Sequence, residues 1–594
     1  MAKHFAPAGG PERTRGGRRG RQDHRARHLP EGPDAAPSPN APAGEKNLAP
    51  REGSASRTPA APAGDAGTSD VVGRSAAMMS ALVIVSRITG FVRTWAQAYA
   101  LGTTLLASCY TVANNLPNQL YELVMGGMLV TAFLPVYLGA KRRAGQEGAN
   151  RYISNLLSIV LLLMGVLAVG CVALAAPLVW VQSAGTDQSQ MVDAVFLFRF
   201  FAVEVVLYCL STVASGVLNA ERDYFWSSAA PIFNNLITIS SFALYAVVSR
   251  ANPAAALLVL GLGHPLGVLV QVLVQLPSLR RRGVRLTLRI DLRDPALRET
   301  LAIGVPSLVV TLCSFVTVAV MNSSALVAVP EQGSSIQYYA RLWYTLPYSI
   351  FAIPITTALF TELSSLFADA DLSGFAQAVV SGMRQILFVL VPFMLYLMVF
   401  ARPLMTLMRM GQFGAESAQL TSAYLTSLAV ALPFYGLTTF FQKVFSSMRR
   451  MVLFAIANVV ASVAQVAFTV ALTPVIGIHA VSLGSALCAA LIDVVSVIML
   501  RRSVAGFGLR GIVGSAARSL ALGALGAAVG AGILWGLTTL AGPADSPARA
   551  LAYVAAGGLP ALAATFGAAI ALGVPEAAFY ARALSRVTGR LRRG

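Results

Sequence analysis

The sequence predicts an all-α polytopic membrane protein. Of its 594 residues, 56% are hydrophobic and only 12% are charged. Long apolar segments with helical periodicity recur from residue 75 to about residue 580, and a helix needs about 20 mostly apolar residues to cross a bilayer. Their number predicts about 14 transmembrane helices. We expect two six-helix lobes around a central cavity, followed by two C-terminal helices.

The predicted spans are residues 75–100, 105–139, 152–182, 192–219, 225–249, 253–279, 301–329, 336–366, 376–400, 417–447, 450–473, 477–500, 513–541 and 549–579. The last two are rich in Ala, Gly and Leu, which favours a peripheral position over a role in the central cavity.

Basic residues gather in alternate gaps between these spans. The gap after the second span holds Lys141, Arg142 and Arg143, and residues 280–298 contain seven arginines. Because basic loops stay in the cytoplasm, the pattern predicts that both termini are cytoplasmic. It also explains the net charge of +19, so we do not expect a nucleic-acid partner.

The charge pattern and composition divide the chain further. We predict a disordered basic cytoplasmic tail at 1–70, because this stretch has almost no large apolar residues. The other predicted parts are an N-terminal transmembrane lobe at 71–280, a cytoplasmic amphipathic linker at 281–300, a C-terminal transmembrane lobe at 301–502, two extra transmembrane helices at 503–580 and a basic cytoplasmic tail at 581–594.

Among the arginines inside predicted spans, Arg87, Arg93 and Arg341 are the candidates for a functional site. Arg87 is about 12 residues into the first span, or roughly 18 Å deep at about 1.5 Å per residue. An arginine near the bilayer centre costs about 2.5–3.5 kcal/mol on insertion scales, so it normally faces a polar cavity or a partner. With Arg93 and Arg341, it predicts an anion-binding cavity. The alternative is a structural ion pair of Arg87 or Arg93 with Glu122 or Glu204.

The second predicted span carries amides around a proline. Asn114, Asn115 and Asn118 flank Pro117, and a proline removes a helical hydrogen bond and bends the helix. We therefore predict that the three asparagines line the substrate cavity. Pro117 is a candidate hinge.

Five further residues carry predictions. Gly90, between the first two arginines, is a second candidate hinge, and Glu122 and Glu204 are candidates for ion coupling. Tyr338 and Tyr339 are expected at the membrane interface, where tyrosine is enriched.

Signals of catalysis and of cofactor binding are absent from the sequence. It contains no G-x-x-x-x-G-K-[ST] loop, and His264 and His479 are isolated from each other and from other metal-ligand residues along the chain. We therefore expect no metal, no cofactor and no enzyme activity. Transport would then depend on ion gradients or on the membrane potential, which is worth about 2.3 kcal/mol per charge per 100 mV.

One family resemblance is specific enough to name. The run Ser86-Arg87-Ile88-Thr89-Gly90-Phe91-Val92-Arg93, followed by Leu116-Pro117-Asn118 and Ala132-Phe133-Leu134-Pro135, resembles the start of the lipid II flippases (MurJ/MviN) of the MOP exporter superfamily. The resemblance covers about residues 74–580.

This resemblance implies a flippase that moves lipid-linked peptidoglycan precursor to the outer leaflet of the bacterial plasma membrane by alternating access. Arg87 and Arg93 match the family's arginines in helix 1, and Arg341 resembles that of helix 8. The implied partners are an undecaprenyl-pyrophosphate-linked precursor, membrane lipids and proteins of cell-wall synthesis. The last two helices of the family form a groove for the lipid tail.

Departures from the family pattern leave alternatives open. Arg341 lies six residues before Pro347, where the family has five, and Ser108 and Tyr121-Glu122 replace an acid and a basic pair. The cargo would then be another polyprenyl-linked saccharide, or a drug exported in exchange for a cation. A membrane-embedded glycosyltransferase and a scaffold for cell-wall enzymes are more distant alternatives.

The orientation is directly testable. We predict that a reporter fused after Arg143 is cytoplasmic and that one fused after Ser183 is outside, because the basic gap precedes the third span and a gap of low charge follows it. Paired alkaline phosphatase and fluorescent-protein fusions measure this. The opposite pattern would overturn the predicted topology.

Overall fold

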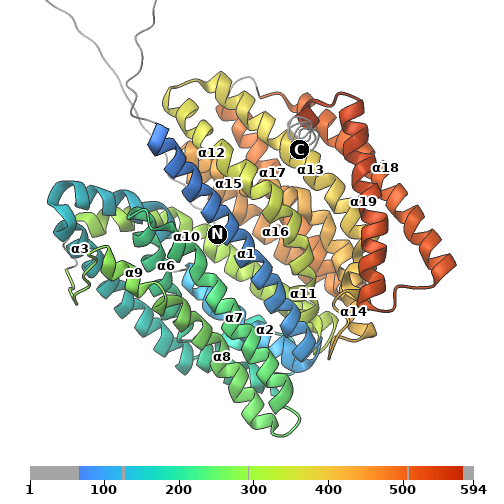
Figure 1. Cartoon of the computed structure of the whole chain (residues 1–594), viewed down its shortest axis with the longest axis horizontal. Coiled ribbons are helices and arrows are strands. Elements are labelled where there is room, and N and C mark those ends of the chain that lie inside the picture. The colour runs from blue at the N-terminus through green and yellow to red at the C-terminus, as the bar shows by residue number, and fades with distance from the viewer. Residues whose placement is uncertain (1–65, 124–126, 292, 294, 505–506, 579–594) are drawn as a thin grey trace, which may run out of the picture. The chain divides into compact units, whose positions relative to one another are not determined.

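The computed structural model describes residues 66–123, 127–291, 293, 295–504 and 507–578, without the side chains of 66–77, 80, 127–135 and 295–308. Secondary structure in this part of the chain is helical throughout, which confirms the predicted fold class (Figure 1). The predicted tail at 581–594 and residues 1–65 of the other tail lie outside the described residues. The first helix begins at Ala66, so the last five residues of the predicted tail, 66–70, belong to α1.

The first half of the molecule, before the linker, is built from nine helices. Their bounds are α1 Ala66–Leu101, α2 Leu105–Tyr121, α3 Gly127–Ala173, α4 Ala175–Gln182, α5 Val192–Phe201, α6 Glu204–Ala220, α7 Tyr224–Val248, α8 Pro253–Leu273 and α9 Leu276–Arg281. This half is irregular at two places. Helix α3 has non-helical backbone at Ala144 and Gly145, and α5 meets α6 at an angle of 41°.

The second half follows the linker, and two more helices end the described chain. The bounds are α10 Pro295–Ala328, α11 Gly333–Pro347, the π-helical turn η3 Tyr348–Ala352, α12 Ile353–Ala368, α13 Leu372–Thr406, α14 Ala415–Leu428, α15 Leu432–Ser447, α16 Met451–Ile476, α17 His479–Ser503, α18 Leu509–Ala541 and α19 Pro547–Ala571.

Eleven of these helical stretches, or twelve if the bent pair α5–α6 is one span, are long and apolar enough to cross a membrane. They match the third to fourteenth predicted spans. The first two are not among them: α2 has only 17 residues, and side chains in the first part of α1 lie outside the described residues. The exact number of fourteen therefore stays a prediction.

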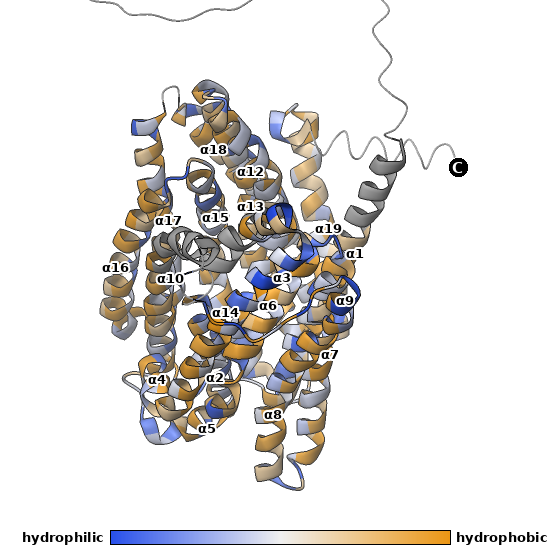
Figure 2. Ribbon diagram, turned by 90° about the vertical axis from the view of Figure 1, so that its left-hand side faces the viewer, coloured by the Kyte–Doolittle hydropathy of each residue, from blue (hydrophilic) through white to orange (hydrophobic). Residues whose placement is uncertain are grey.

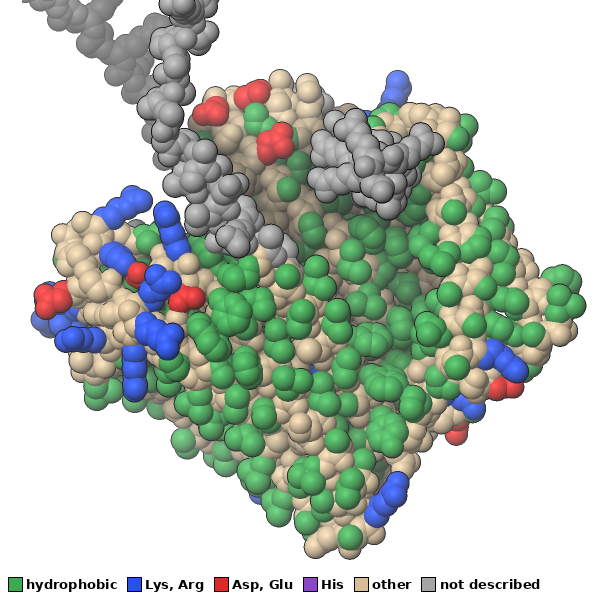
Figure 3. Space-filling view, viewed as in Figure 1, with side chains coloured by type: hydrophobic (Ala, Val, Ile, Leu, Met, Phe, Trp, Pro, Cys, Tyr) green, Lys and Arg blue, Asp and Glu red, His purple; other side chains and the backbone are tan. Residues whose placement is uncertain are grey.

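Apolar side chains cover the faces of the helices, as expected for a multi-pass membrane protein. Orange dominates the ribbons and blue gathers at their ends in the hydropathy view (Figure 2). On the face drawn in Figure 3, Lys and Arg gather at one end, over α3 and α9, beside a broad hydrophobic surface. This segregation of charge suits a slab of lipid around the helices.

The linker between the two halves is extended rather than helical over Val284–Asp291. Its backbone amides at Thr287, Arg289 and Asp291 donate to Ser154, Ser158 and Asn155 of α3, at 3.1, 3.0 and 2.7 Å. Leu286, Leu288 and Ile290 alternate with these residues and are exposed. The alternation gives the linker one apolar edge, and its position at the membrane surface stays a prediction.

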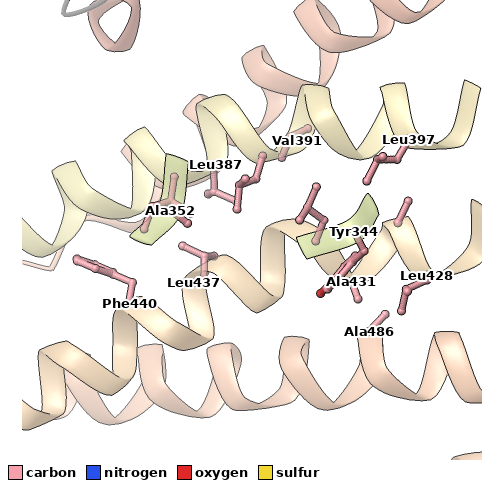
Figure 4. Packing of buried hydrophobic residues seen from close by; sticks show 14 of the residues in the cluster. Tyr344, Ala352, Leu387, Val391, Leu397, Leu428, Ala431, Leu437, Phe440 and Ala486 are labelled. Atoms are coloured by element: carbon pink, nitrogen blue, oxygen red, sulfur yellow. The ribbon is translucent and has the colours of Figure 1, made fainter. Parts of the chain in front are cut away.

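Buried apolar residues form separate clusters in the two halves. One cluster joins residues of α10 to α19 with Ala98 of α1, and part of it is drawn in Figure 4, where Leu387 of α13 points toward Leu437 of α15. Two others lie within the first half, one around Tyr110 and Phe201 and the other around Tyr137 and Val213. Each half is thus held together largely by its own core.

One end of the two halves is tied together by hydrogen bonds. These bonds join segments that the charge pattern places outside the cell. They are Gln412 N to Tyr99 O at 2.9 Å, Thr103 Oγ1 to Gln332 Oε1 at 3.1 Å, Thr103 Oγ1 with Ser417 Oγ at 2.7 Å, Asn322 Nδ2 to Gln182 Oε1 at 2.7 Å, and Ser323 Oγ to Ala184 O. We call this set the outer seal.

Glycines bring α18 and α19 against α13. A Cβ atom on Gly526 would lie 2.1 Å from Thr565 Oγ1 and 2.5 Å from Ala561 O. Tyr396 of α13 donates a hydrogen bond to Thr565 at the same place, at 2.5 Å. Close helix packing in a bilayer depends on such small residues, because the hydrophobic effect does not drive helices together in lipid and van der Waals contact must do so.

We predict that Gly526→Leu destabilises the protein by about 1–3 kcal/mol, because the new side chain must push α18 away from its neighbours. Reversible unfolding of the purified protein in mixed micelles measures the loss. Gly532→Leu is the matched control on the same helix, since a Cβ atom there meets nothing within 4 Å. Equal losses for the two variants would contradict the packing account.

Candidate functional site

Arg87 and Arg93 of α1 differ in how exposed they are. Arg93 is half-buried, and Arg87, almost two turns earlier, is exposed. The side chain of Arg93 interacts with the hydroxyl of Tyr338 on α11 and lies near Tyr110 of α2 and Tyr208 of α6. It therefore sits where α1 meets both halves of the molecule.

Arg341 lies one turn after Tyr338 on α11 and is half-buried. Its charge acts on Tyr344, on Tyr424 of α14 and on Glu122 at the end of α2. Arg87 is electrostatically coupled to Tyr348, in the π-helical turn that follows α11. Each of the three predicted arginines thus lies near a tyrosine of the α11–η3 segment.

These tyrosines, Tyr338, Tyr344 and Tyr348, are defined here as the tyrosine row. Tyr348 donates a hydrogen bond to Thr439 at 3.2 Å, and its ring lies 4.8 Å from that of Tyr435. Tyr339 is completely buried against Phe413, so the predicted interfacial position does not hold for it. Tyr338 interacts with Arg93, and its position relative to the membrane surface stays a prediction.

A cavity of about 310 Å³ opens beside Arg341 in the second half of the molecule. Many of its lining side chains are polar, including Gln337, Tyr344, Tyr424, Tyr435, Thr438, Thr439, Gln442, Asn458, Ser462 and Gln465. Hydroxyl and amide groups of this kind both donate and accept hydrogen bonds. Together with one guanidinium group, they suit a ligand that is rich in hydroxyl or amide groups and carries negative charge.

A second pocket, also of about 310 Å³, is almost entirely apolar. It lies between α11, η3, α13 and α19, and its lining includes Trp343, Ile350, Phe393, Phe400 and Leu562. The tyrosine row belongs to the same α11–η3 segment. A hydrocarbon chain fits such a surface without leaving polar atoms unpaired.

The three asparagines of α2 have different surroundings. Asn118 lies beside Tyr208 and donates to the carbonyl of Asn114 at 3.3 Å. Asn114 has a buried Nδ2 with no hydrogen-bond partner among the described residues, and Asn115 is half-buried. The structure therefore brings Asn118 to the Arg93 group and leaves Asn114 with unused donor capacity.

The two candidate hinges are regular in this structure. Helix α2 continues through the buried Pro117 and ends at Tyr121. Helix α1 is continuous through Gly90, whose Cα faces Asn235 of α7. Asn235 donates to Thr89 Oγ1 at 3.0 Å, so Gly90 sits in a helix–helix contact. Hinge motion at either residue stays a prediction.

Glu204 has a different partner from the one expected. Instead of an arginine, it accepts from or donates to His264 of α8, with 2.8 Å between Oε1 and Nδ1. Tyr208 donates to its other oxygen at 3.2 Å. The proposed ion pair of Glu204 with Arg87 or Arg93 is therefore wrong, and His264 is not isolated. Glu122 is exposed and lies near enough to Arg341 to feel its charge.

Sequence reasoning missed Tyr110, Tyr208, His264 and the polar lining of the cavity. Local patterns gave no signal for them, because the pairs that matter join distant segments: Glu204 and His264 are 60 residues apart. Among the described residues, no three of His, Cys, Asp and Glu are grouped in a way that could hold a metal ion. No cofactor enters the account of the site.

Comparison with known proteins gives the family. The family model "Lipid II flippase MurJ" matches residues 97–543. "Probable lipid II flippase MurJ" of Rhizobium meliloti (strain 1021) is 25% identical over 357 residues, 59% of this chain and 66% of the relative. "Lipid II flippase MurJ" of Burkholderia cenocepacia is 25% identical over 366 residues, 60% of this chain and 70% of the relative. The alignments thus span about two thirds of these relatives.

Solved structures agree at the level of fold. A structure of "Lipid II flippase MurJ, inward closed conformation" has a TM-score of 0.66 at 18% identity, covering 83% of this chain and 99% of that one. An inward-facing multidrug resistance MATE family transporter of the MOP superfamily has a TM-score of 0.53 at 16% identity, covering 74% and 94%. Since the family model matches well over half of its residues, this chain belongs to the lipid II flippase MurJ family of transporters.

Proposed function

We propose that the protein flips lipid-linked peptidoglycan precursor, lipid II, from the cytoplasmic to the outer leaflet of the bacterial plasma membrane by alternating access. The observation that carries this proposal beyond family membership is the tyrosine row, which lies near Arg87, Arg93 and Arg341 at the meeting of the two halves. Both termini are cytoplasmic in this proposal.

The parts of the site match the parts of such a substrate. Guanidinium groups of Arg93, Arg87 and Arg341 bind the pyrophosphate, whose oxygens suit their donor geometry. The polar cavity beside Arg341 takes part of the sugar–peptide head group, and Asn118 contributes near Arg93. The apolar pocket beside α19 holds part of the polyprenyl chain, so that the tail stays in a lipid-like environment during transfer.

Alternating access requires that the outer seal open. Its bonds join side chains and backbone of the two halves through a few residues, such as Thr103, Gln332 and Ser417. Such bonds are each worth about 0.5–1.5 kcal/mol net, so their exchange for water is affordable within a transport cycle. Rigid movement of the halves is favoured because each half has its own core.

The membrane potential is the proposed main source of energy. A pyrophosphate carries roughly two negative charges, and each is worth about 2.3 kcal/mol per 100 mV when it crosses the field. With the inside negative, outward movement of the anion is downhill. Return of the empty, positively charged site to the inside is downhill as well, so both half-cycles run toward export.

A second candidate function is export of a cationic drug, or of another polyprenyl-linked saccharide. Likeness to the MATE fold and the buried acids Glu204 and Asp493 favour the drug exporter. The arginines and the charge of the site favour an anionic lipid instead. Growth of a strain depleted of its own flippase distinguishes these candidates, because neither alternative restores it.

We predict that Arg87→Ala and Arg93→Ala abolish this complementation, because each removes a cation from the anion site. Arg87→Lys is impaired, since a lysine cannot form the bidentate contact. Arg341→Ala should also lose function, because it removes the guanidinium group that lines the polar cavity. Colony formation of the depleted strain, with membrane levels of each variant measured in parallel, tests these outcomes.

Arg250→Ala is the matched control, since Arg250 is exposed in the turn between α7 and α8. It should grow like the unmodified protein. Normal growth of the Arg93→Ala strain, with the variant present in the membrane, would contradict the proposed site.

A further inference from the structure

A buried acid–histidine pair lies next to the anion site without belonging to it. Glu204 is completely buried and His264 is 4% exposed, and 2.8 Å separates Oε1 from Nδ1. Burial of a lone carboxylate among apolar side chains is costly, so the pair is stable only while a proton or a partner charge compensates it. No role in the proposed transport cycle has been given to these two residues.

Both residues lie at irregular points of their helices. Glu204 is the first residue of α6, directly after the 41° bend that separates α5 from α6. His264 is followed by Pro265 inside α8, and a proline there frees the carbonyl oxygen of the preceding turn. In membrane transporters, broken helices commonly mark sites where ions or substrates bind.

One side chain connects the pair to the arginine site. Tyr208 donates to Glu204 Oε2 at 3.2 Å, and the same tyrosine lies next to Arg93 and Asn118. Tyr110 of α2 also lies between the charges of Glu204 and Arg93. The groups that face Glu204 are therefore His264 from α8, Tyr208 from α6, Tyr110 from α2 and, behind the tyrosines, Arg93 from α1.

We propose that Glu204 and His264 form a proton-binding site, and that its occupancy controls how strongly Arg93 binds an anionic headgroup. Uptake adds one proton from solvent to the pair and changes its net charge from −1 to 0; release reverses the change. The unprotonated pair attracts Arg93 through Tyr208 and adds a negative charge near the anion. The protonated pair leaves Arg93 free for pyrophosphate.

Thermodynamic linkage fixes the direction of this effect. Since the proton strengthens anion binding, anion binding must also promote proton uptake, by the same factor. Such couplings typically amount to about fivefold or more. The inference rests on the proposed function only in the identity of the anion, so the proton site itself is testable without transport.

The first measurement uses the purified full-length protein without ligand. Infrared difference spectra between about pH 5 and 8, the range in which histidine ordinarily changes charge, should contain a signal of the pair that is absent in Glu204→Gln. Glu221→Gln is the matched control, because Glu221 is a carboxylate of the same half whose partners are Lys141 and Tyr137 instead of His264 and Tyr208. An identical signal in Glu204→Gln would overturn the proton site.

The second measurement is binding of geranylgeranyl pyrophosphate, a soluble prenyl pyrophosphate, at both ends of this pH range. We expect the affinity at about pH 5 divided by the affinity at about pH 8 to be lower by about fivefold or more in Glu204→Gln than in the unmodified protein. Comparison of the two proteins removes the effect of pH on the ligand itself. Tyr208→Phe should lose the same coupling while it keeps the infrared signal. If Glu204→Gln fails to fold, His264→Gln, which removes the imidazole and leaves the carboxyl, is compared instead.

An unchanged affinity ratio in all folded variants would overturn the coupling. Absence of prenyl pyrophosphate binding at either pH, with the infrared signal present, would contradict the proposed substrate class but leave the proton site standing. The two ideas therefore fail separately.

Discussion

The cost of placing arginine within a membrane is the constraint on which the rest of the site depends. Arg93 and Arg341 are half-buried inside their helices, and an uncompensated cation within a membrane is unfavourable by about 2.5–3.5 kcal/mol on insertion scales. Most of the partners that the structure gives these arginines are neutral hydroxyl groups: Tyr338 interacts with Arg93, and Tyr344 and Tyr424 lie near Arg341, which is also electrostatically coupled to the exposed Glu122. Neutral partners leave the positive charge available to an incoming anion, whereas a salt bridge would have cancelled it.

The buried carboxylate of Glu204 is consistent with this interpretation, because its direct partners are not the arginines of α1. Glu204 bonds to His264 within the first half of the molecule, and only a tyrosine connects it to Arg93. The proposed anion site and the acid–histidine pair are thus separate but connected through Tyr208. Most buried apolar residues of each half belong to clusters of that half, although Ala98 of α1 packs in the cluster of the second half and Leu326 of α10 in one of the first. The placement of these charges and the packing of the two halves therefore have to be considered together.

Much of the fold, and less of the site, could be predicted from the sequence. Length and hydropathy gave the third to fourteenth spans, because about 20 apolar residues report directly on the bilayer. The bend before Glu204, the π-helical turn after Pro347 and the extended linker on α3 were missed, since they depend on tertiary contacts such as those of Ser154 and Asn155. Arg87 and Arg93 were found by their depth alone. His264 and the tyrosine row were not, because a side chain's partner on another helix leaves no periodic trace in the sequence.

Photocrosslinking inside living cells tests the central claim most directly, namely that the tyrosine row lines the path of an anionic lipid. A photoreactive phenylalanine analogue in place of Tyr338 should capture the lipid-linked precursor, and Arg93→Ala should abolish the adduct. The same analogue in place of Trp535, which is 71% exposed on α18, should capture bulk lipid without dependence on Arg93. Equal capture of the precursor at both positions, or capture at position 338 that survives Arg93→Ala, would contradict the account.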